Sequence, residues 1–146
     1  MKTLHFDSGI QEYKLCGEGV LRFNPSDPNL YARFMEAAEK IQGIEKEMAQ
    51  QASTMDTRDT GPAVVKLLQE ADGKMKDTLS WVFGQDNDFH KLLGGVNLLA
   101  VGANGQRVVT NLFAALQPIL LAGAERCAKE QTQAAVSKAK ARRSSQ

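Results

Sequence analysis

The apolar residues of the first 23 positions fall in short stretches with the two-residue period of a β-strand. Asp7-Ser8-Gly9 and Gly17-Glu18-Gly19 interrupt these stretches and have the composition of turns. Residues 1–23 are therefore predicted to form two or three short antiparallel strands. A hairpin alone is marginally stable in water, so this one must pack on an apolar surface. The stretches contain Leu4 and Phe6, Tyr13 and Leu15, and Val20 with either Leu21 or Phe23.

A long helix is predicted directly after the strands, from about residue 28 to residue 52. Asp27 can accept a hydrogen bond from the first helical turn, and Pro28 suits the first helical position because its missing N–H is not needed there. The alternating spacing of four and three residues between apolar positions predicts that this helix packs along another helix. Pairing within the chain is favoured over pairing with a second chain. The apolar positions are Leu30, Phe34, Ala37, Ile41, Ile44 and Met48.

A second helix is predicted from residue 62 to about residue 83, after a polar loop at 53–60. Its apolar face combines Val65, Leu68, Ala71, Met75, Leu79 and Val82. Residues 86–93 have the pattern of a short helix that ends at Gly94-Gly95. Residues 96–103 then form either a connector or another short helix.

The last predicted helix begins after Asn104, which is a candidate N-cap residue. Pro118 lies inside it and removes a hydrogen bond to the carbonyl of Ala114, so the helix is expected to kink or to divide in two. Few apolar residues other than alanine follow Cys127. The expected core face contains Val108, Leu112, Leu116, Ile119 and Leu120.

These elements predict an α+β fold that is mainly α. A small N-terminal antiparallel hairpin region (1–23) precedes a bundle of three to five helices (24–124), and together they form a single domain, 1–124. A helical extension follows at 125–146. The chain has 146 residues, of which 42 % are hydrophobic and 24 % charged, as in soluble globular proteins. A chain of this length can bury a sizeable core without disulfides or metal ions.

The net charge of +1 conceals an uneven distribution of charge. The extension at 125–146 has six basic and two acidic residues (+4), whereas residues 1–124 have 12 basic and 15 acidic residues (−3). Basic residues in a last helical turn also complement the helix dipole. Because no DNA-binding motif or stacking aromatic accompanies them, we do not expect a nucleic-acid partner.

Cys16 and Cys127 lie far apart in the sequence, without a CxxC motif or clustered histidines. This pattern predicts neither a disulfide framework nor a zinc site, and both thiols are expected to be free and buried. Residues 1–10 lack the apolar run of a signal peptide. The richest apolar stretch, at 119–122, is much shorter than the roughly 20 residues of a membrane span. A cytoplasmic protein with no membrane partner is expected.

No motif of a known catalytic class is present: HExxH, GxSxG, GxxxxGK and a strand-linked GxGxxG are all missing. The stretch Asp86-Asn87-Asp88-Phe89-His90 is similar to the front of a calcium-binding loop. Lys91 and Asn97 occupy the positions where that loop requires Gly and Glu, so a helix cap formed by Asp86 or Asp88 is favoured. We expect neither an enzyme nor a bound cofactor or metal.

Five bulky apolar residues near glycine turns are candidates for a surface that binds a partner or a second copy of the chain. The alternative is that they close the core. The five residues, within thirteen positions, are Trp81, Phe83, Phe89, Leu92 and Leu93.

Two motifs carry a resemblance to a known family. The first runs from Gly19 through FNPSDPN to Arg33-Phe34, and the second joins Trp81-Val82-Phe83-Gly84 and Lys91 to residues 111–119. In this order they resemble the small tail assembly chaperones encoded by siphophages and prophages of Gram-positive bacteria. The similarity covers most of residues 15–122. Its motif residues include Asn24, Pro25, Asp27, Pro28, Phe34, Gly84, Phe113, Leu116 and Pro118.

The resemblance implies a function in phage tail assembly. Many copies of such chaperones bind the long helical tape measure protein and keep it soluble until tail tube proteins polymerise around it. Grooves between helices can cover the apolar stripes of an aggregating helix. The resemblance also implies action in the cytoplasm of the infected host and absence from the mature virion. Association into a homo-oligomer is a separate expectation. The alternative is a phage-encoded inhibitor of a host defence system, such as an anti-CRISPR, that acts by binding a protein.

Overall fold

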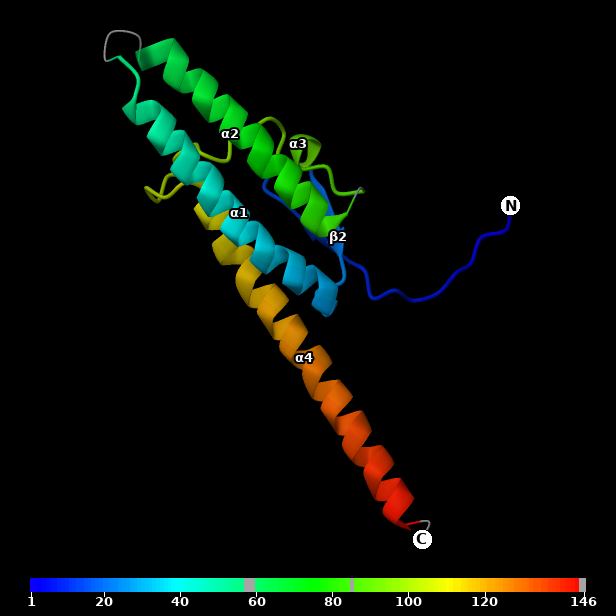
Figure 1. The fold of residues 1–146 in the computed structure, drawn as a ribbon. Helices are drawn as coiled ribbons and strands as arrows, with labels where there is room; N and C mark the ends of the chain where they lie inside the picture. Colours follow the sequence, from blue (N-terminus) through cyan, green and yellow to red (C-terminus); the bar gives the residue numbers. More distant parts are fainter. Residues whose placement is uncertain (57–59, 85, 145–146) are drawn as a thin grey trace.

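A computed structural model describes residues 1–56, 60–84 and 86–144 of the chain. Figure 1 shows a two-stranded hairpin followed by a mainly helical arrangement. This architecture confirms the predicted α+β fold with mainly helical content. Residues 57–59 of the predicted polar loop lie outside the described residues. The described elements are β1 (Gln11–Lys14), β2 (Val20–Phe23), α1 (Pro28–Ser53), α2 (Thr60–Phe83), α3 (Phe89–Leu92) and α4 (Val108–Ser144).

The hairpin pairs β1 and β2 antiparallel, with Tyr13 opposite Leu21. Leu21 and Phe23 are buried, and the Phe23 ring stacks on Tyr13 at a centroid distance of 4.7 Å. The hairpin thus packs on the apolar body as expected. Leu4 and Phe6 do not form a strand, because residues 1–10 have no backbone partner strand among the described residues and both side chains are exposed.

Helix α1 follows the predicted pattern closely. The Asp27 side chain accepts a hydrogen bond from the N–H of Asn29 at 2.9 Å, and Pro28 occupies the first helical position. The residues of the predicted apolar seam contribute to the core, and α1 packs against both α2 and α4. Packing within one chain, the favoured alternative, is therefore confirmed for this seam. Its buried members are Leu30, Phe34, Ala37 and Ile41.

Helix α2 lies alongside α1 and begins at Thr60, two residues before the predicted start. Pro62 is tolerated there because N–H groups of the first turn need no helical partner. The helix ends at Phe83, where Gly84 has the positive φ of 100° that glycine tolerates. The buried face combines Ala71, Met75, Leu79 and Val82.

The short helix α3 is confined to four residues. Asp88 caps it by accepting a hydrogen bond from the N–H of His90 at 3.0 Å, which confirms the cap that was favoured over a calcium loop. The connector from α3 to α4 is fastened to α2 by Asp72, whose Oδ1 accepts the N–H of Leu98 at 2.8 Å. The other carboxylate oxygen of Asp72 pairs with the buried Lys76 ammonium at 2.9 Å.

Helix α4 begins at Val108, so the prediction of Asn104 as its N-cap is wrong. Asn104 instead accepts a hydrogen bond from the N–H of Gln106, within a turn that pairs Val101 with Arg107 and delays the start of the helix. The helix continues through Pro118, which excludes a division in two, one of the two outcomes predicted for this proline. Both Pro118 and Ala114 are exposed, and water can satisfy the Ala114 carbonyl that loses its helical partner.

Only the first half of α4 packs on the body of the protein. The backbone at Gly123 lies so close to Pro25 that a Cβ atom would overlap the Pro25 carbonyl oxygen. One turn later, Arg126 Nη2 donates a hydrogen bond to Ser26 Oγ at 2.8 Å. All residues from 128 to 143 are exposed, and Figure 1 shows this part of α4 projecting from the body. We call residues 128–143 the C-terminal arm. The predicted boundary at residue 124 lies within this same helix.

Candidate functional site

The five residues predicted to form a partner surface do not lie on one surface. Phe83 and Phe89 are buried, and their rings pack together at a centroid distance of 5.5 Å. For these two the structure confirms the alternative, that they close the core, and they do so next to the hairpin residue Phe23. Leu92 and Leu93 are half-buried against the same core.

Trp81 differs from the other four because it is 45 % exposed. The Lys40 ammonium of α1 lies 4.4 Å from the centroid of its ring. This geometry is that of a cation–π contact between α1 and α2. The exposed indole is thus part of a helix-to-helix contact on the outside of the bundle.

The two family-like motifs meet between α1 and α4. Phe34 of the first motif stacks on Phe113 of the second, with ring centroids 4.8 Å apart. Leu116, which also belongs to α4, is buried, whereas Pro118 is exposed. Residues separated by about 80 positions in the sequence therefore form one contact.

The β2–α1 junction of the first motif is held by its own polar residues. Asn24 Oδ1 accepts the N–H of Ser26 at 2.9 Å, and Asn24 Nδ2 donates to the carbonyl of Ser8 at 3.1 Å. Pro25 is buried, with its carbonyl against Gly123 of α4. In the second motif, Gly84 terminates α2. These contacts give the motif residues a structural role at helix ends.

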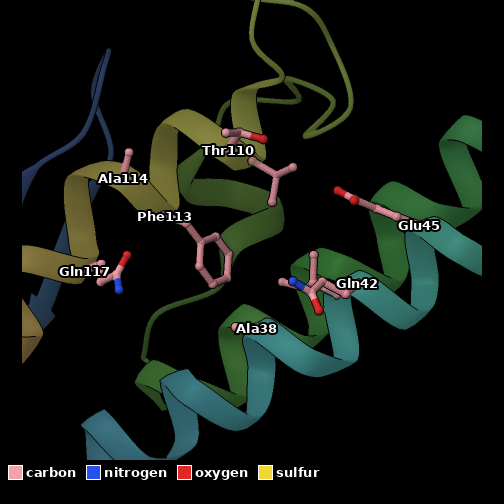
Figure 2. A pocket seen from close by; sticks show the side chains of 9 residues that line it. Ala38, Gln42, Glu45, Thr110, Phe113, Ala114 and Gln117 are labelled. Atoms are coloured by element: carbon pink, nitrogen blue, oxygen red, sulfur yellow. The ribbon is translucent and has the colours of Figure 1, made fainter.

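A groove lies between α1 and α4, beside the Phe34–Phe113 stack, and has a volume of about 370 Å³. Figure 2 shows Phe113 pointing from α4 into this space, with Ala38 and Gln42 on α1 facing it. Apolar and small side chains form much of the lining, and Gln42, Glu45 and Gln117 supply polar groups. We call this the α1–α4 groove. Its lining residues are Ala38, Ile41, Gln42, Glu45, Val109, Thr110, Phe113, Ala114 and Gln117.

Carboxylates lie in and beside the α1–α4 groove. Glu45 is the ionisable residue among the nine that line it. Glu36 and Glu39 line a neighbouring hollow on α1, and Glu36 is paired with Lys40 at 3.7 Å. Helix α4 contributes no charged residue between its start and Glu125. A ligand of this groove therefore meets an apolar wall on α4 and carboxylates on α1.

The apolar half of α4 is largely uncovered. An 18-residue stretch within Val108–Arg143 is apolar enough to cross a membrane by length and composition alone, and only 22 % of it is buried. A core helix of a soluble protein can pass the same test. Sequence reasoning missed this property because it considered only the short run at 119–122. Leu121, for example, remains 39 % exposed.

The groups with chemical reactivity are dispersed. His90 Nε2 lies 2.7 Å from Asp77 Oδ1 in an exposed pair that joins α3 to α2. Cys16 is exposed in the segment between β1 and β2, so its predicted burial is wrong, and Cys127 is half-buried. Both thiols are free. Within the three described ranges, no group of three or more His, Cys, Asp or Glu residues could hold a metal ion.

Comparison with known proteins found no matching family model, no similar curated protein and no similar solved structure.

Sequence reasoning missed the α1–α4 groove because the groove depends on how two distant helices cross. Phe113 lay outside the apolar face that was predicted for the last helix. The available signal was the small residues Ala38 and Ala114 beside it, which leave space between the helices.

Proposed function

We propose that the protein is a phage tail assembly chaperone that binds apolar helical segments of the tape measure protein in the α1–α4 groove. The observation that carries this proposal is the groove itself, which combines an apolar lining with polar groups at its edges. The family resemblance supplies the identity of the client. In this proposal many copies act in the cytoplasm of the infected host, before tail tube proteins assemble around the client.

The shape of the groove favours a helical ligand. Amphipathic helices commonly bind by placing apolar side chains into a groove between helices. Ala38 and Ala114 have small side chains, so a third helix can approach the backbones of α1 and α4 closely. Ile41 and Phe113 can then contact the apolar stripe of that helix. The side-chain amides of Gln42 and Gln117 can pair with polar residues beside that stripe.

The charge around the groove defines the client further. Glu39 and Glu45 lie on the α1 side, and α4 supplies no compensating cation along its apolar half. Opposite charges across an interface favour the correct partner and speed association. We therefore expect client segments in which Lys or Arg flanks an apolar stripe.

The test is co-expression with the tape measure protein of the same phage. Ala114 lines the groove, and its neighbour Ala115 is exposed but outside the lining. Ala114→Glu places a charge in the groove, and Ala115→Glu is the matched control. We expect the wild type and Ala115→Glu to keep the tape measure protein soluble and to co-purify with it, whereas Ala114→Glu does neither. Equal solubilisation by both variants would contradict the proposal.

The anti-defence alternative is separated by a pull-down from phage-infected cells. A chaperone retains the tape measure protein, whereas an inhibitor of host defence retains a host nuclease or sensor protein. Recovery of the host protein without the tape measure protein would replace the proposed function with the alternative.

A further inference from the structure

One exposed face of α4 runs from the α1–α4 groove into the C-terminal arm. The groove residues Thr110, Ala114 and Gln117 are followed on this face by Leu121 at helical spacing. The same spacing passes Ala124 and Glu125, which lie on either side of the midpoint of the face, and continues in the arm. Apart from Ala124, the members of the face are exposed, and its arm residues are Ala128, Thr132, Ala135 and Ala139.

The face is self-complementary about a point between residues 124 and 125. Each groove position lies as far before that point as one arm position lies after it: 110 matches 139, 114 matches 135, 117 matches 132, and 121 matches 128. Two α4 helices that pair antiparallel about a two-fold axis would therefore place each arm beside the partner's groove.

We propose that the C-terminal arm of a second copy of the chain occupies the α1–α4 groove, in a two-fold dimer that pairs the α4 helices antiparallel. The matched residues suit such a contact. Ala114 meets Ala135, which allows the helices to approach closely, and Leu121 meets Ala128. Gln117 meets Thr132, and both side chains can form hydrogen bonds.

Charge complementarity identifies the arm as the occupant. The arm contains five basic residues and one acidic residue. Position 139 is matched with Thr110, which lines the groove together with Glu45, so Lys138 is placed close to the α1 carboxylates. Arg107 also lies at this end of α4, and Lys46 follows Glu45 on α1, so the pairing proposed for the arm is that of Lys138 with Glu45 itself. The basic arm therefore meets the acidic side of the groove.

The dimer also explains what covers the apolar half of α4, of which 22 % is buried in one chain. Before a client arrives, the partner's arm would shield the groove from water and from aggregation, and the client would displace it. This regulatory role rests on the proposed function. The dimer itself requires no client, so the two proposals can fail separately.

The first experiment measures the mass of the full chain in solution by analytical ultracentrifugation and light scattering. We expect twice the chain mass of 15.9 kDa. Ala135→Glu places a charge on the pairing face, whereas Ala134→Glu places it about 100° around the helix. Ala135→Glu should raise the dimer dissociation constant by about tenfold or more, and Ala134→Glu should leave it unchanged. Circular dichroism verifies that both variants remain folded.

The second experiment tests the charge pairing. Glu45→Lys and Lys138→Glu should each weaken the dimer, and the double variant should recover part of the lost affinity. Because the attraction is electrostatic, the loss of dimer affinity caused by each single substitution should be smaller at high salt. Single and double variants with the same affinity as the wild type would overturn the assignment of the arm to the groove.

Two results would contradict the proposed dimer without contradicting the proposed function. A chain that is monomeric in solution but solubilises the tape measure protein contradicts the dimer alone. A monomer that sediments with anionic lipid vesicles shows that a lipid surface, and not a second copy, covers α4. Conversely, a dimer sensitive to Ala135→Glu that fails to bind the tape measure protein contradicts the proposed function alone.

Discussion

The side-chain amide of Asn87 pairs with the backbone of Arg22 as a neighbouring strand would. Its Oδ1 accepts the N–H of Arg22 at 2.9 Å, and its Nδ2 donates to the carbonyl of Arg22 at 2.8 Å. The same Nδ2 donates to the carbonyl of Phe83 at 2.9 Å. A single buried side chain thus supplies hydrogen-bond partners for the backbone of Arg22, on the edge of β2 that does not face β1, and links this strand to the end of α2.

Asn87→Ala is expected to lower the free energy of unfolding by about 1–3 kcal/mol, because it leaves backbone groups of Arg22 and Phe83 without partners. Urea unfolding followed by circular dichroism measures the change. The control is Asp86→Ala at the exposed neighbouring position, which should change stability by less than about 0.5 kcal/mol. Equal effects of the two substitutions would show that the amide contacts are unimportant.

Asp72→Ala is expected to destabilise the protein by about 3 kcal/mol or more, because it leaves the Lys76 ammonium buried without a counter-charge. It also removes the acceptor of the Leu98 N–H. The double variant Asp72→Ala/Lys76→Met should be more stable than Asp72→Ala alone, since no buried charge remains. Glu36→Ala breaks the exposed pair with Lys40 and should cost about 0.5 kcal/mol or less. A similar loss of stability in Glu36→Ala and Asp72→Ala would refute the claim that the buried ion pair matters more than the exposed one.

Gly123→Ala and Gly73→Ala are expected to have opposite effects, although both replace a glycine within a helix. A Cβ at residue 123 meets the backbone of Pro25, whereas at residue 73 it meets no atom within 4 Å. Gly73→Ala should therefore stabilise the protein by up to about 1 kcal/mol through helix propensity. Gly123→Ala should lower the melting temperature. The idea of a tight α4 contact fails if both variants melt above the wild type.

Cys16 is expected to react with a maleimide faster than Cys127, because Cys16 is exposed and Cys127 is half-buried. Mass spectrometry of the native protein at early times should find the label on Cys16. Cys16→Ser should remove the fast phase, and both thiols should react alike in denaturant. Faster labelling of Cys127 would contradict the placement of the segment between β1 and β2.

Local patterns predicted the features that depend on residues close in sequence. The Asp27 cap, Pro28 at the first helical position and the buried seam from Leu30 to Ile41 follow from neighbours within one or two helical turns. The Asp88 cap is of the same kind. Both caps join a side chain to a backbone N–H two residues later.

Features that join distant parts of the chain were not predictable in this way. Asn87 and Arg22 are 65 residues apart, and no periodicity indicates that they meet. The burial of Phe89 depends on the rings of Phe83 and Phe23, which belong to other elements. The groove likewise requires the crossing of α1 and α4, and Asn104 lost its predicted role to a turn stabilised by the bridge between Val101 and Arg107.

The contact at Gly123 also sets the rotational phase of everything that follows it in α4. Each residue of an α-helix turns the chain by about 100°. A one-residue insertion between Cys127 and Ala128 would therefore turn Ala135 and Val136 to a different side of the helix and leave the contacts of Gly123 and Arg126 with the body in place. An insertion of seven residues would nearly restore the original direction and lengthen the helix by about 10 Å. The number of residues between Gly123 and a given position of the arm therefore determines the direction in which that side chain points.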